Sequence, residues 1–70
     1  MFNHNKLRGR IREVLGTESE YSKVIGKSLT STSKRLNGEI QFDAIDIKKS
    51  VEALNIKVDE ISEYFFTLKV

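Results

Sequence analysis

The sequence contains no cysteine, no proline and a single histidine among its 70 residues. Without cysteine it can form neither a disulfide framework nor a thiolate zinc site. The lone imidazole belongs to His4, which we expect to lie in a frayed N-terminal segment. We therefore predict no metal site and no cofactor, and the absence of disulfides favours a cytoplasmic location.

Long apolar runs are missing as well. No segment approaches the roughly 20 consecutive apolar residues that span a bilayer, and the N-terminal MFNHNKLRGR lacks the apolar stretch of a signal peptide. The sequence also shows no catalytic pair of acids, no nucleophile beside a base and no histidine cluster. It therefore predicts neither an enzyme nor a membrane protein, and no small-molecule substrate.

The charges that are present are unevenly distributed. Residues 1–38 carry eight Lys or Arg against three Glu, a net charge of +5, whereas residues 39–70 carry four Lys against seven Asp or Glu, a net charge of −3. A basic half in a small protein is typical of nucleic-acid contact, although a solvated charged face gives the same pattern. The acids of the second half would complement a basic protein partner; they are Glu39, Asp43, Asp46, Glu52, Asp59, Glu60 and Glu63.

Helical spacing of apolar residues and well-placed capping residues predict an all-α fold within one domain, residues 1–70. Thr17 and Glu20 fit a capping box, Ser28 and Asp43 fit N-caps, and Gly26 fits a left-handed helix end. Apolar residues of the first helix, Leu7, Ile11, Val14 and Leu15, are expected on its inner face. The five predicted helices span about residues 5–15, 18–25, 29–36, 44–54 and 59–65, and the final FFTLKV, residues 65–70, is expected to be extended.

The stretch GKSLTSTSKRLNG, residues 26–38, is the most distinctive part of the chain. It is not a phosphate-binding loop, because the position five residues before Gly26 is Tyr21 rather than glycine. Helix signals on both sides argue against disorder. A helix, a glycine turn and a second helix rich in short polar and cationic side chains predict a helix-turn-helix at about residues 17–37. A helical hairpin with a purely structural role stays an alternative.

The series GTxxEYSKVIGKSxxxxSxRLNG, residues 16–38, resembles the helix-turn-helix of the Cro/CI-type phage regulator family. The flanking KLRGRIREVLGT and DEISEYFFTLKV resemble a small subgroup of that family in temperate phages of Gram-positive bacteria, the one containing the modulator of repression of lactococcal phages. This resemblance implies a compact five-helix fold of the lambda-repressor-like type. It also implies a cytoplasmic regulator of the lysis and lysogeny switch in the host bacterial cell, with double-stranded operator DNA and a CI-type phage repressor as partners.

When the family's contact positions are transferred to this sequence, the resemblance implies which residues read bases and which contact phosphates. The base-reading positions fall on Leu29, Thr30 and Lys34. The phosphate-contacting positions fall on or near Lys27, Ser28, Ser31 and Arg35.

Four positions depart from the family pattern. Glu18 stands where a glutamine commonly touches the DNA backbone, and its negative charge would oppose phosphate. Lys27 and Thr32 stand where apolar residues are usual, and Leu29 stands where a polar base reader is usual. The departures leave an alternative in which the chain is an antirepressor that uses Glu18 and Leu29 to bind a CI-type repressor, with little DNA binding of its own.

Overall fold

The computed structural model describes residues 2–68, and these residues form an all-helical fold without strands. The helices are α1 (Asn5–Val14), α2 (Glu18–Ile25), α3 (Leu29–Leu36), α4 (Ala44–Leu54) and α5 (Ile61–Phe65), with a 3₁₀ turn, η1 (Val58–Glu60), just before α5. The predicted five-helix, all-α fold is thereby confirmed. The predicted last helix is divided into η1 and α5, and the predicted extended end is helical at Phe65. Its residues 69–70 lie outside the described part.

Local capping chemistry sets most of these boundaries. The Thr17 hydroxyl accepts from the Glu20 backbone N–H at 3.2 Å, and Gly26 ends α2 in the left-handed region at φ 69°. Asn55 ends α4 in the same region, at φ 53°. The predicted Thr17 capping box is only half formed, because the Glu20 carboxylate binds the Lys23 ammonium at 3.2 Å. The α4 N-cap, Asp43, forms a complete capping box with Asp46.

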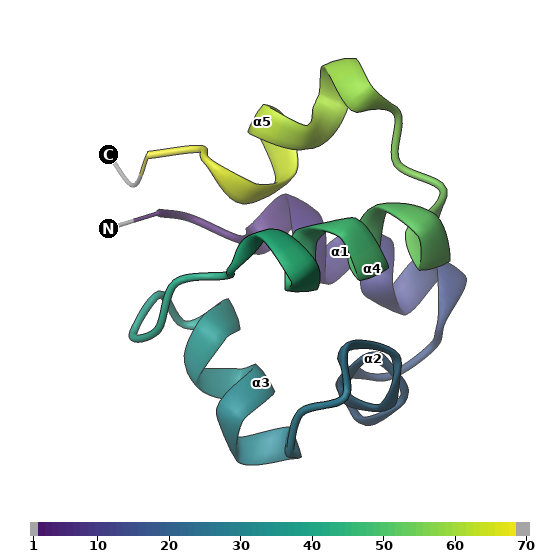
Figure 1. Cartoon of the computed structure of the whole chain (residues 1–70), viewed down its shortest axis with the longest axis vertical. Helices are drawn as coiled ribbons and strands as arrows, with labels where there is room; N and C mark the ends of the chain where they lie inside the picture. The colour runs from purple at the N-terminus through teal and green to yellow at the C-terminus, as the bar shows by residue number, and fades with distance from the viewer. Residues whose placement is uncertain (1, 69–70) are drawn as a thin grey trace.

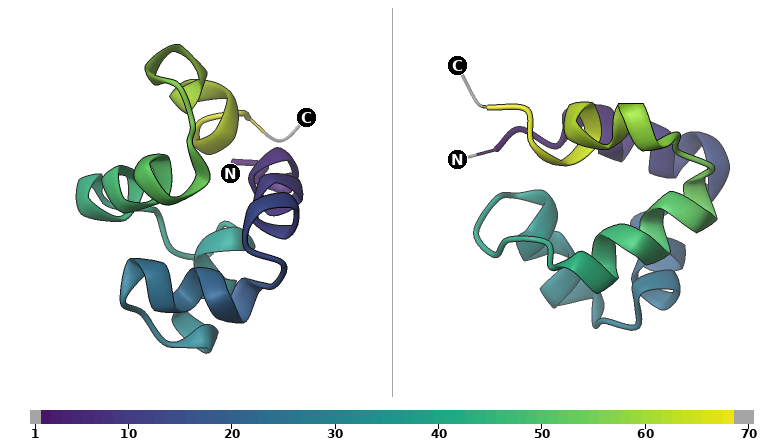
Figure 2. Two further views of the ribbon diagram at one scale, coloured as in Figure 1. Left: turned by 90° about the vertical axis from the view of Figure 1, so that its right-hand side faces the viewer. Right: turned by 45° about the horizontal axis from the view of Figure 1, so that its top comes forward.

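The helices are arranged in three levels, seen in both Figure 1 and the left view of Figure 2. The end formed by α5 lies at the top, α1 and α4 occupy the middle, and α2 and α3 lie at the bottom. All five helices contribute to one core, whose buried apolar residues are Leu7, Ile11, Tyr21, Ile25, Leu36, Leu54, Ile56, Tyr64 and Phe65. Val14 is exposed, contrary to the prediction, because α1 ends there and Leu15, the next residue, packs against the core instead.

The start of the described chain is packed, not frayed. His4 is only 5 % exposed, and its ring makes an edge contact with Phe42 at a centroid distance of 5.1 Å. Phe2 and Leu68 form an isolated antiparallel bridge, and the Asn3 N–H donates to the Thr67 carbonyl at 2.7 Å. The expectation for His4 was wrong because these contacts come from residues far along the chain. We call the residues Phe2, His4, Phe42, Phe65 and Phe66 the aromatic cluster.

Within residues 2–68, no helix has the length and apolar character needed to cross a membrane.

Candidate nucleic-acid interface

A short turn joins α2 to α3 and places the start of α3 on the surface. After Gly26 the Lys27 N–H donates to the Ser22 carbonyl at 3.0 Å, which closes the end of α2. Ser28 is extended and its hydroxyl accepts from the Ser31 N–H at 3.1 Å, so α3 begins with a side-chain cap. Both capping roles were predicted from the sequence, and both are confirmed.

Four of the predicted contact residues are exposed. Ser28, Thr30 and Lys34 are open to solvent, and Leu29 is 51 % exposed. Thr30 and Lys34 are four residues apart, so they share one face of α3. Lys34 has no ion-pair partner among the described residues. The exposed surface of α3 and its N-cap therefore presents a hydroxyl pair, an ammonium and one apolar side chain to a binding partner.

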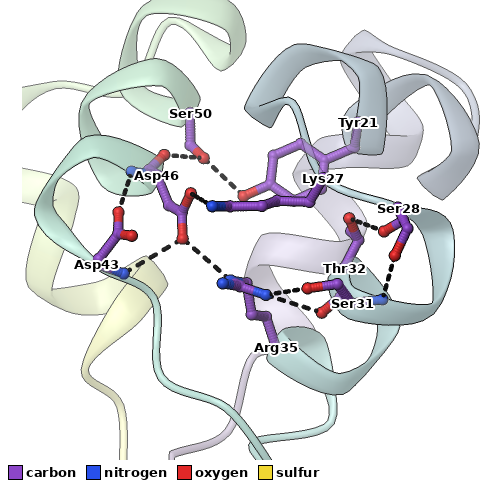
Figure 3. Close-up of polar contacts among 9 residues, drawn as sticks. All are labelled: Tyr21, Lys27, Ser28, Ser31, Thr32, Arg35, Asp43, Asp46 and Ser50. Atoms are coloured by element: carbon purple, nitrogen blue, oxygen red, sulfur yellow. Dashed lines mark hydrogen bonds and ion pairs between the residues drawn. The ribbon is translucent and has the colours of Figure 1, made fainter.

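Of the other three predicted contact residues, Lys27 and Arg35 face Asp46 on α4, and Ser31 is bonded to Arg35. The side chain of Arg35 is 11 % exposed, and its Nε donates to Asp46 Oδ2 at 3.0 Å (Figure 3). Its Nη1 donates to the carbonyl and the hydroxyl of Ser31, the former at 3.2 Å. Lys27 Nζ lies 4.0 Å from Asp46 Oδ1. One buried carboxylate thus faces two cations, and the Asp43 carboxyl lies close to the same two.

The centre of this arrangement is Asp46, whose side chain is 1 % exposed. Its N–H donates to Asp43 Oδ1 at 2.7 Å, and the Asp43 N–H donates to Asp46 Oδ2 at 3.3 Å. The first of these bonds lowers the pKa of the Asp43 carboxyl. Asp46 was predicted among the acids that would face a partner, and for this residue the prediction was wrong: a carboxylate buried against Arg35 cannot reach one.

Two further polar groups join α2 to α4. The Ser50 hydroxyl donates to the Asp46 carbonyl at 2.7 Å, so its single proton is used there, and Tyr21 must donate across the 2.6 Å contact to Ser50 Oγ. Burial raises the pKa of Tyr21 to about 12. We call Tyr21, Lys27, Arg35, Asp46 and Ser50 the Asp46 network (Figure 3).

This network was missed in the sequence. The one local signal for it is the spacing of three between Asp43 and Asp46, which is typical of a reciprocal helix cap. Arg35 precedes Asp46 by eleven residues across a loop, so no periodic pattern connects them. Thr32, a departure from the apolar pattern, is fully buried, and its hydroxyl donates to the Ser28 carbonyl at 2.9 Å.

Glu18 is half-buried at the first position of α2, where the positive end of the helix dipole stabilises its charge. It forms no ion pair within the described residues. No group of three or more possible metal ligands occurs in residues 2–68.

Comparisons with known proteins add two findings. The model of a family described as "Protein of unknown function (DUF739)" matches residues 1–68. The fold is similar to the solution structure of the modulator of repression (MOR) of the temperate bacteriophage TP901-1 from Lactococcus lactis, with a TM-score of 0.80 and 30 % sequence identity over 99 % of this chain and 93 % of that one. No curated protein sequence matches the chain. The predicted likeness to a modulator of repression is confirmed, while membership of the Cro/CI-type family stays a prediction.

Proposed function

This chain belongs to the DUF739 family. From its likeness to a phage modulator of repression we propose that it regulates the choice between lysis and lysogeny. As its mechanism we propose binding of operator DNA by α2 and α3, used as a helix-turn-helix in one domain. The observation that carries this proposal is the exposed, capped start of α3 with Thr30 and Lys34 on one face.

Each residue then has a role that follows from its exposure. Lys34 and Thr30 reach base edges in the major groove, and Leu29 contacts a thymine methyl. Ser28 lies at the positive end of α3, where backbone N–H groups favour a phosphate. Ser31, Lys27 and Arg35 take the phosphate-contacting positions, but Asp46 holds both cations, so these residues act mainly by fixing α3.

DNA binding is tested by selecting duplexes from a randomised library with the purified protein and measuring their affinity by fluorescence anisotropy. We expect Lys34→Ala to weaken the selected duplex by about ten- to a hundredfold and to relax its sequence preference. Lys57→Ala is the matched control, because Lys57 is an exposed lysine outside α2 and α3 and should leave affinity nearly unchanged. A protein that selects no duplex at low salt does not bind DNA by itself.

A second candidate function is supported by Leu29 and by the structural relative, which is a modulator of repression. Leu29 is a large apolar side chain, half exposed at the start of α3, and Glu18 adds a negative charge that would oppose a phosphate. We propose as the alternative that this surface binds a CI-type repressor and that the chain acts as an antirepressor.

Leu29→Glu should then abolish co-purification with such a repressor. Val58→Glu is its control, because Val58 is 82 % exposed on η1, outside the surface formed by α2 and α3. Complex formation that survives Leu29→Glu would exclude this surface as the repressor contact. The two functions separate in one amide-shift titration of the labelled protein, first with the selected duplex and then with the repressor's N-terminal domain.

A further inference from the structure

Two adjoining pockets open where the start of the chain meets the end of α3 and the loop that follows it. Phe2 and His4 line both pockets. None of the residues proposed to contact DNA lines either one, and Asn37, which lines the second, lies at the opposite end of α3 from Ser28. In Figure 1 this region lies where the two ends of the described chain run side by side.

The two pockets differ in chemistry. The first has a volume of about 230 Å³ and no charged residue in its wall, which includes Ile40, Phe42, Phe65, Phe66 and Leu68. The second has a volume of about 200 Å³ and a polar wall, to which Asn3, Asn5, Arg8 and Asn37 contribute. A side chain that entered the first would therefore meet aromatic rings, and a neighbouring group would meet amides and a guanidinium.

Among residues 2–68, no carboxylate compensates the positive charge of the polar pocket. Arg8 has no carboxylate partner within residues 2–68; its Nη2 donates to Asn37 Oδ1 at 2.5 Å. Arg8 Nε is buried without an acceptor, whereas Nη1 is not among the buried atoms and donates to no described group. One guanidinium nitrogen is thus open to an incoming anion.

Helix α1 begins at the same pocket, and the positive end of its dipole adds to the positive electrostatic potential there. Its N-cap, His4, makes no side-chain cap, and its first turn contains no acid. His4 is 5 % exposed and its Nδ1 has no partner. Two buried polar atoms without a partner among the described residues, Arg8 Nε and His4 Nδ1, thus lie in the wall of this pocket, and backbone groups of Phe65 and Leu36 lie near the imidazole.

Pocket size selects the kind of ligand. A cavity of about 150 Å³ accommodates benzene, whereas pockets for drug-sized molecules begin at about 300 Å³. The apolar pocket thus accepts one large side chain.

We propose that the two pockets together bind a segment of a partner protein in which a carboxylate stands next to a large apolar side chain. The carboxylate meets Arg8 Nη1 and the amide of Asn37, and the apolar group enters the aromatic pocket. A nucleic-acid backbone fits less well, because Arg8 is the single cation in the wall of the polar pocket.

The test uses N-acetyl-L-phenylalanine, which carries a ring and a carboxylate, and its neutral amide. Each is titrated into the isotope-labelled full chain. We expect the acid to shift the amide signals of Asn5, Asn37, Phe42 and Phe66 and to bind about tenfold more tightly than the amide. Binding of the acid should also raise the pKa of the His4 imidazole, because a nearby negative charge favours its protonated form.

Variants of Arg8 test whether its guanidinium causes the tighter binding of the acid. Arg8→Gln should reduce the affinity for the acid to that for the amide, and Arg8→Lys should restore part of it. Arg12→Gln is the matched control, an exposed arginine of the same helix that lines neither pocket, and should change nothing. If Arg8→Gln unfolds the chain, the affinities of the unaltered protein for the acid and the amide still show whether the pocket prefers a carboxylate.

Four results would overturn the proposal. The first is equal affinity for acid and amide, and the second is no shift at these residues. The third is a stronger shift of the same signals by single-stranded oligothymidylate that Arg8→Gln removes, which would make the pocket a nucleic-acid site. The fourth is a concentration-dependent shift without ligand, which would show that a second copy of the chain covers the pockets.

Discussion

The two ends of the molecule hold their helices together by different means. At the α2 and α3 end, the Asp46 network joins three helices through directed hydrogen bonds and ion pairs. At the α5 end, the aromatic cluster joins the chain start, the loop before α4 and α5 by edge contacts between rings. A buried polar group that loses its partner is left unpaired in a low dielectric, whereas an edge-on ring pair contributes only about 0.5–1.5 kcal/mol beyond the area that it buries. The end held by polar contacts carries the proposed DNA surface, and the end held by ring contacts carries the two pockets.

The strongest way to break this comparison is Asp46→Ala. The substitution leaves Arg35 almost buried without its carboxylate and removes half of the α4 capping box. We expect the free energy of unfolding to fall by about 3–5 kcal/mol, measured by urea denaturation followed by circular dichroism. Arg35→Met combined with Asp46→Leu should recover much of the loss, because the uncompensated charge is then gone. A loss below about 1 kcal/mol would mean that the network contributes little to stability.

Phe42→Ala tests the other end. Phe42 is partly buried and contacts the rings of both His4 and Phe65, the latter at a centroid distance of 5.2 Å. We expect a loss of about 2 kcal/mol, less than for a fully buried phenylalanine. The shifts of α5 and chain-start amides should spread widely, while those of α2 and α3 should stay in place. Uniform shifts across both ends would contradict the distinction between them.

A different distinction, between local and distant contacts, explains what the sequence could predict. Helix bounds follow from caps and apolar spacing, which are local, so α2, α3 and α4 agree with their predicted ranges and Gly26, Ser28 and Asp43 have their predicted roles. Contacts between distant segments leave no local pattern. The burial of His4 depends on Phe42 and Phe65, and the burial of Arg35 depends on Asp46.

The prediction of the site residues was also limited by contacts between distant segments. Exposure of Ser28, Leu29, Thr30 and Lys34 fits their predicted contact roles. Arg35 was predicted from its charge and position on α3, and charge alone does not tell whether a guanidinium faces solvent or a buried carboxylate.

Tyr21→Phe makes a smaller change in the Asp46 network. It removes one buried hydrogen bond to Ser50 and should cost about 1 kcal/mol at neutral pH. The pKa of Tyr21 is raised to about 12 from 10.0, so the folded state holds its proton more tightly than the unfolded state does. The unaltered protein should therefore lose stability as pH rises from about 10 towards 12, and Tyr21→Phe should lose less over the same range, measured by urea midpoints.

His4 predicts the opposite pH dependence for the aromatic cluster. Burial lowers the pKa of His4 below its ordinary value of 6.5, and the nearby Arg8 guanidinium acts in the same direction. The unfolded state therefore takes up a proton at a pH where the folded state does not, so stability is complete above about 6.5 and falls as pH drops towards the folded-state pKa. His4→Phe keeps an aromatic ring against Phe42 but cannot take up a proton, and its urea midpoint should be flatter between about pH 7.5 and pH 5.5. If both proteins show the same slope, carboxylates and not His4 set the acid limit. A steeper slope in the unaltered protein, together with early loss of chain-start amide signals, would show that the aromatic cluster opens first in acid while the Asp46 network still holds α2 to α4.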